Sequence, residues 1–103
     1  MIAPLLAAAL TVMPWKGLTY KVNVTGAAHE RVPLLAQGLP HGWIASFCDA
    51  HTCSPFAYAL QLNARGGGWI ELRFVRTDPA AAHRVRVRVS APGAPPVSLV
   101  IVR

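Results

Sequence analysis

Two cysteines and a histidine lie close together in one short segment of this chain. Cys48, His51 and Cys53 fall within six residues, and His41 lies a little upstream. Two cysteines at this spacing can close a disulfide across the end of a hairpin, where Cα atoms come within the ~5.5–6 Å that the bond needs. The same side chains also offer two thiolates and an imidazole, which are ligands that Cu(I) and Zn²⁺ accept.

The spacing favours the disulfide over the metal. It is not the Cys-x-x-Cys of redox enzymes, and it matches no structural zinc pattern. A disulfide in a short chain indicates an extracytoplasmic protein, whether periplasmic, secreted or membrane-associated. We therefore expect a Cys48–Cys53 bond and no metal or other cofactor. A copper or zinc site made of Cys48, His51, Cys53 and His41 is the alternative, which would make the chain a periplasmic metal-binding protein.

A row of arginines marks the most regular strand pattern of the chain. Arg84, Arg86 and Arg88 alternate with valines and therefore project from one face of a strand, and Arg73 is a candidate to extend the same surface. Such a row could contact phosphates or anionic lipid. It lacks the interleaved aromatic side chains that bind single-stranded nucleic acid, which argues against a nucleic-acid partner. The interpretation that we favour over a docking surface is a solvated outer face that guards a sheet edge against aggregation.

Three tryptophans and four acids complete the inventory of side chains that could bind or react. Trp15, Trp43 and Trp69 could form a platform for stacking sugars, although the alternation around Trp43 places that residue in the core. The acids are scattered over the chain, at Glu30, Asp49, Glu71 and Asp78. No Ser-His-Asp spacing, Gly-x-Ser-x-Gly elbow or phosphate-binding glycine loop is present. We expect no catalytic residues and no enzyme.

The composition limits the chain to one small, basic domain. It has 103 residues, of which 53% are hydrophobic and 14% charged, and its net charge is +6. This excludes a disordered chain and allows an anionic partner without selecting one. Residues 1–15 are apolar, with an Ala-x-Ala at 7–9, and predict a signal peptide or a retained N-terminal arm. As a helix they would span only ~22 Å, too short for a membrane. The domain itself is expected over 16–103.

Short alternating segments separated by Gly and Pro predict an all-β fold. About seven strands are expected at spacings near ten residues, which is typical of an immunoglobulin-like β-sandwich with antiparallel strands. The predicted strands are Leu18–Thr25, Arg31–Ala36, Trp43–Phe47, Phe56–Asn63, Trp69–Arg76, His83–Ser90 and Val97–Val102. Pro33 predicts an edge or a bulge in the second of them.

The order of these features resembles the small immunoglobulin-like modules of bacterial secreted proteins, including the domain that accompanies some glycosidases. The resemblance is carried by the turn Leu39-Pro40-His41-Gly42-Trp43, the glycines 66–68 and the Val-rich end of the chain. It implies an immunoglobulin-like fold and a non-catalytic accessory role, and it transfers no functional residues.

The function expected from the sequence is an interaction module or accessory subunit of a cell-envelope or membrane-associated assembly. Its partner would be another protein of the envelope, with an anionic lipid or polymer as an alternative. A carbohydrate-binding or polyanion-binding module is the further alternative.

Overall fold

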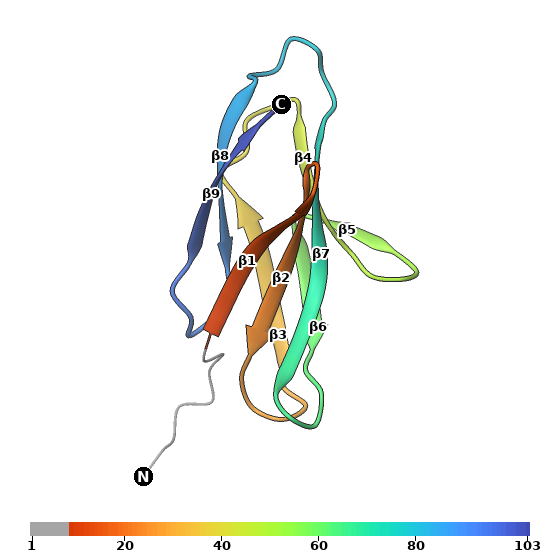
Figure 1. Cartoon of the computed structure of the whole chain (residues 1–103), viewed down its shortest axis with the longest axis vertical. Helices are drawn as coiled ribbons and strands as arrows, with labels where there is room; N and C mark the ends of the chain where they lie inside the picture. The colour runs from red at the N-terminus through yellow and green to blue at the C-terminus, as the bar shows by residue number, and fades with distance from the viewer. Residues whose placement is uncertain (1–8) are drawn as a thin grey trace.

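The computed structural model describes residues 9–103 and builds them into two antiparallel sheets with no helix (Figure 1). The five-stranded sheet has the order β1-β2-β7-β4-β5, and the four-stranded sheet has the order β6-β3-β8-β9. The strands are β1 (Ala9–Lys16), β2 (Thr19–Thr25), β3 (Arg31–Gln37), β4 (Trp43–Cys48), β5 (Cys53–Pro55), β6 (Ala57–Gln61), β7 (Gly67–Arg76), β8 (Arg84–Ser90) and β9 (Val97–Val102). The all-β class predicted from the sequence is confirmed.

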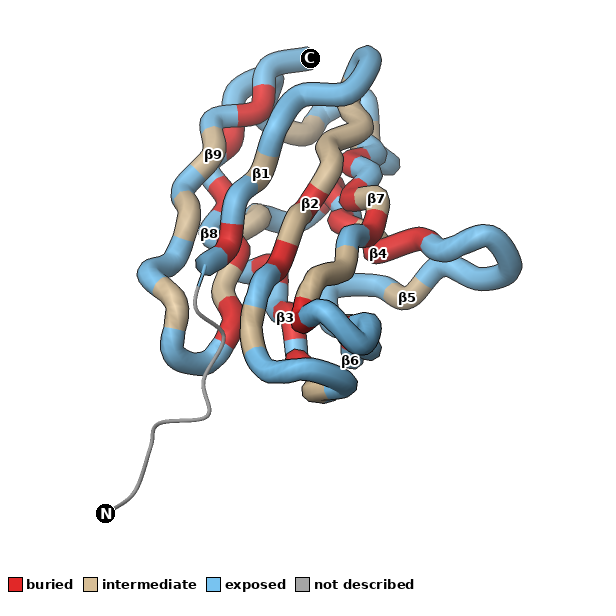
Figure 2. Tube along the Cα trace, turned by 60° about the horizontal axis from the view of Figure 1, so that its bottom comes forward, coloured by how far each residue is buried: buried red, intermediate tan, exposed pale blue. Residues whose placement is uncertain are grey.

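The core lies between the two sheets and is made mainly of alternate residues of β2, β3, β4, β7 and β8. Buried positions alternate with more exposed ones along β7 and β8, which is the period of a strand with one buried face. Figure 2 shows the same recurrence of buried positions along β2. Val87 and Leu72 are fully buried from opposite sheets, whereas Arg86 and Arg73 point to solvent. No polar side chain is buried among residues 9–103. The sandwich is therefore held by apolar packing and by its backbone ladders.

Within residues 9–103 the structure has nine strands, two more than the sequence predicted. One of them, β1, lies in the segment 1–15 assigned to a leader or arm, except for its last residue, Lys16. It pairs with β2 along its whole length and buries Leu10 against the core. The uniformly apolar composition of this segment hid its alternation, because its outward residues are apolar too. Residues 1–8 of the predicted leader lie outside the described residues.

The second additional strand, β5, follows the disulfide and pairs with β4 over three residues. The chain then passes to the other sheet through Phe56, which was predicted as the first residue of a strand. Its φ of 64° takes it out of the extended region. Its N–H donates to the carbonyl of Ala45 in one sheet, at 2.8 Å, and its carbonyl accepts the N–H of Ala36 in the other, at 2.9 Å. Phe56 is therefore the crossing point between the sheets.

Pro33 was predicted to mark an edge or a bulge, but β3 is an interior strand of its sheet and its register with β6 is unbroken at Pro33. The pairing explains how the proline is accommodated. β3 pairs with β6 from Arg31 to Leu35, but with β8 only from Leu35 to Gln37. Pro33 therefore lies where β3 has a neighbour on one side only, which is where a residue without an N–H is tolerated.

In residues 9–103 no helix is long and apolar enough to cross a membrane.

Candidate functional site

The predicted disulfide is confirmed, and it closes a hairpin that projects from the five-stranded sheet (Figure 1). Cys48 and Cys53 are directly paired residues of β4 and β5, with their Cα atoms 4.0 Å apart. Phe47, the residue before the bond, is fully buried in the core. Disulfides are typical of proteins in oxidising compartments outside the cytosol.

The same bond removes the thiolates that the alternative metal site requires. His41 is also remote from the hairpin, because it precedes β4 whereas Cys48 ends it, a separation of about 20 Å along a strand. Among residues 9–103 no three His, Cys, Asp or Glu side chains are grouped so that they could hold a metal ion. The disulfide thus takes the place of the copper or zinc centre considered from the sequence.

Asp49 organises the turn of the hairpin. Its Oδ1 accepts the backbone N–H groups of His51 and Thr52, both at 2.7 Å, and its Oδ2 accepts the hydroxyl of Tyr58 at 3.0 Å. The N–H groups of Thr52 and His51, followed by the Tyr58 hydroxyl, lower the pKa of Asp49 below its ordinary 3.8. Partial burial, and then the hydrogen bond to Asp49, raise the pKa of Tyr58. The turn is therefore fixed to β6 by a charge-assisted hydrogen bond.

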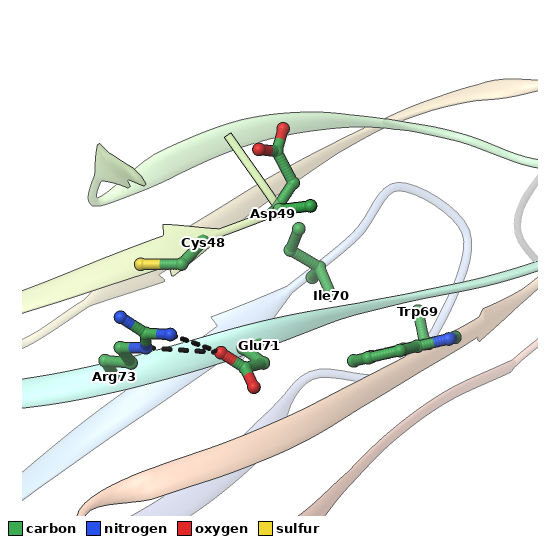
Figure 3. Close-up of a pocket in the computed structure, with 7 residues that line it drawn as sticks. Cys48, Asp49, Trp69, Ile70, Glu71 and Arg73 are labelled. Carbon is green, nitrogen blue, oxygen red and sulfur yellow. Dashed lines mark hydrogen bonds and ion pairs between the residues drawn. The ribbon is translucent and has the colours of Figure 1, made fainter. Parts of the chain in front are cut away.

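A hollow of about 570 Å³ lies between this hairpin and the outer face of β7. Its size is within the ordinary range of ligand sites. The residues lining it are Cys48, Asp49, Ala50, Trp69, Ile70, Glu71 and Arg73. Figure 3 shows the Trp69 ring at one end, the Glu71–Arg73 ion pair along one side and Asp49 across from them. The hollow thus combines one large aromatic wall with charged groups.

Trp69 also belongs to an exposed aromatic pair on the same face. Its ring is nearly parallel to that of Trp15, with an interplanar angle of 9° and centroids 6.2 Å apart. The Lys21 ammonium lies 4.6 Å from the Trp69 centroid and 5.2 Å from the Trp15 centroid, so both rings take part in cation–π contacts. Both tryptophans stay about half exposed. Trp43, the third tryptophan considered from the sequence, is buried, and its Nε1 donates to the carbonyl of Ala82 at 2.8 Å.

The Glu71–Arg73 pair fixes one edge of the hollow. Arg73 donates from Nη2 and Nε to Glu71 Oε2, at 2.7 and 3.2 Å. Glu71 Oε1 and Arg73 Nη1 make no hydrogen bond to the described part of the chain. These two atoms are free to meet a ligand.

The arginines predicted as a partner surface do not lie together. Arg84, Arg86 and Arg88 form a row on the outer face of β8, in the four-stranded sheet, whereas Arg73 belongs to the opposite sheet. The row is flanked on β9 by Val102, Val100 and Ser98, which are its cross-strand partners. The only ion pair among residues 9–103 is Glu71–Arg73, so the three arginines of the row have no acidic partner there.

Sequence reasoning missed the hollow, because its walls come from β7 and from a hairpin more than 15 residues earlier in the chain. One signal was present: Trp69, Glu71 and Arg73 are spaced two apart and had to share a face of one strand. Nothing in the sequence indicated that Asp49 and the disulfide would border that face.

No family model, curated protein or solved structure matches this chain. The geometry of the site is therefore the basis for assigning a function.

Proposed function

We propose that this chain is a non-catalytic, extracytoplasmic binding module that serves as an accessory subunit of a cell-envelope assembly. Its contact surface is the outer face of the five-stranded sheet. The disulfide supports the extracytoplasmic assignment, because such a bond persists where the surroundings are oxidising.

We further propose that the fold is immunoglobulin-like. Supporting this, β1-β2-β7-β4 and β3-β8-β9 have the neighbour relations of the ABED and CFG sheets of that fold. Strands β5 and β6 are then an insertion between the fourth and fifth strands, and the disulfide hairpin begins it. An insertion of this kind is a usual place for a binding surface on a conserved scaffold.

The observation that carries the proposed contact surface is the exposed apolar area on the five-stranded sheet. Met13, Trp15, Trp69 and Val75 are each about half exposed, and Ile44 is 36% exposed. Exposed apolar clusters rimmed by polar groups mark interaction sites, and Trp and Met are enriched at the centres of interfaces. The arginine row of the other sheet is a weaker candidate, since a charged outer face is also an ordinary way to keep a sheet soluble.

Site-specific photo-crosslinking in the cells that produce the protein tests this surface. A benzophenone amino acid replaces Met13 or Ile44 on the proposed face, or Arg86 on the opposite sheet as the matched control. We expect a discrete adduct from positions 13 and 44 and none from 86. Adducts from position 86 alone, or from no position, would reject the five-stranded sheet as the contact surface.

A further inference from the structure

We propose that the hollow beside Trp69 binds a neutral carbohydrate, with Trp69 as the stacking surface. The proposal rests on the proposed function, because it names the ligand of the same sheet face. It applies to one end of that face, where the apolar area meets the hairpin that carries Asp49.

The aromatic wall supplies the first half of the chemistry. One side of a pyranose ring presents C–H groups, which are apolar and slightly positive, and an indole presents a negative π-face. Trp69 is 51% exposed, so a sugar could cover a large part of its ring. The contacts with Trp15 and Lys21 restrain the Trp69 ring before a ligand arrives, which lowers the entropy cost of binding.

The polar lining supplies the second half. Sugar hydroxyls donate and accept hydrogen bonds, and charged partners make the stronger ones. Glu71 Oε1 is an available acceptor and Arg73 Nη1 an available donor on one side of the hollow. A ligand in the hollow would therefore find an apolar surface at one end and hydrogen-bonding groups along one side.

The balance of charge selects among sugars. The charged groups beside the hollow already have partners within the chain: Glu71 pairs with Arg73, the Asp49 oxygens accept from the hairpin amides and Tyr58, and Lys21 lies against the rings of Trp15 and Trp69. Among the described residues of the hollow an acidic sugar would therefore find no unpaired cation to balance its carboxylate, which disfavours it relative to a neutral sugar. A flat apolar protein surface fits the hollow less well, because it would cover these charges without replacing their hydrogen bonds to water.

Affinity electrophoresis tests the inference with the whole chain and neutral polysaccharides as probes. Native gels contain soluble β-glucan, xylan, galactomannan or glycol chitin, and a gel with polygalacturonate provides the acidic comparison. We expect retardation in at least one neutral gel and none in polygalacturonate. Trp69→Ala should weaken the interaction about tenfold or more, as truncation of a central tryptophan commonly does.

Three further variants separate stacking from loss of fold. Trp69→Phe keeps an aromatic face and should retain part of the binding, whereas Trp69→Leu keeps only apolar bulk and should not. Val102→Ala removes an equally exposed apolar side chain from the opposite sheet and should bind like the unchanged protein.

The outcomes distinguish this inference from the function on which it rests. No retardation in any neutral gel, with crosslinks still formed from positions 13 and 44, overturns the carbohydrate and leaves the contact surface in place. Retardation that survives Trp69→Ala, or that is stronger in polygalacturonate, also overturns it. Absence of both retardation and crosslinks removes the inference and the proposed function together.

Discussion

At the scale of single residues, Asp49 has the most distinctive environment in the described part of the chain. The residue is exposed, yet both of its carboxylate oxygens accept hydrogen bonds, two from backbone amides and one from Tyr58. All three favour the ionised form. Asp49 therefore acts as a fixed anion that shapes the turn and borders the hollow.

The order of the hairpin turn is expected to depend on the ionisation of Asp49. The pKa of Asp49 in the folded chain is lower than the 3.8 of the free group. The ionised Asp49 carboxylate therefore stabilises the turn fully above pH 3.8, and this stabilisation is lost as the pH falls through the lowered pKa of the folded chain. Hydrogen exchange of the His51 and Thr52 amides measures this directly, once corrected for intrinsic rates.

Two variants calibrate that measurement. Asp49→Ala removes both acceptors and should leave the two amides weakly protected at every pH. Asp49→Asn keeps one acceptor oxygen and should retain protection that no longer changes below pH 3.8. An unchanged profile in Asp49→Ala would show that the carboxylate does not hold the turn.

At the scale of elements, the β4–β5 hairpin projects from the sandwich, and its β5 strand contributes no side chain to the core. β5 pairs only with β4, at the end of its sheet, and the core side chains of that region come from β4. The disulfide closes a ring of six residues, from Cys48 to Cys53. The disulfide should therefore mainly restrict the conformation of the hairpin loop, and through it the shape of the hollow that the loop borders.

Removing the bond is expected to loosen the hairpin while the sandwich stays folded. Closing so short a ring contributes about 2 kcal/mol in the loop-entropy model. The double variant Cys48→Ala with Cys53→Ala should therefore lose about that much free energy of unfolding in urea and still unfold in one cooperative transition. A chain that no longer unfolds cooperatively would contradict this view of the hairpin. Mass spectrometry of the unchanged protein without reductant should show a mass lower by two hydrogens, which verifies that the disulfide is present before the comparison.

At the scale of the whole molecule, the two outer faces differ in character. Both sheets expose apolar side chains, but the exposed tryptophans lie on the five-stranded sheet, whereas the row Arg84, Arg86 and Arg88 lies on the four-stranded sheet. The net charge of +6 is thus partly gathered on the face opposite the proposed binding surface. The row gives that face a local positive potential that anionic polymers should sense.

Retention on a polyanion is expected to depend on where the charges lie as well as on their number. Replacing Arg84, Arg86 and Arg88 by Gln should lower the salt concentration needed for elution from heparin, because clustered charges release more counterions. Replacing Lys16, Arg31 and Arg65 by Gln removes the same charge from dispersed, exposed sites and should lower the elution concentration less. Equal shifts in the two triple variants would show that net charge alone governs retention. In both triple variants, each substitution should change the free energy of unfolding by less than about 0.5 kcal/mol.

The sequence by itself determined the class of fold, the positions of seven strands and the disulfide. These follow from local patterns: Val85, Val87 and Val89 alternate with arginines, and a strand whose side chains alternate must bury one of its faces. Cys48 and Cys53 are close enough in the chain for one hairpin to join them. In β1 the same local signal was hidden, because Met13 and Trp15 on its outer side are as apolar as Leu10 on its inner side.

Only the tertiary structure decided which of these strands share a sheet, and with that the candidate site. Arg73 and Arg86 look alike in the sequence, but strand order places them on opposite faces of the molecule. Trp15 and Trp69 are more than 50 residues apart and stack because β2 lies between β1 and β7. Pairing between distant strands depends on how all the buried faces fit together, and a local pattern carries no record of that fit.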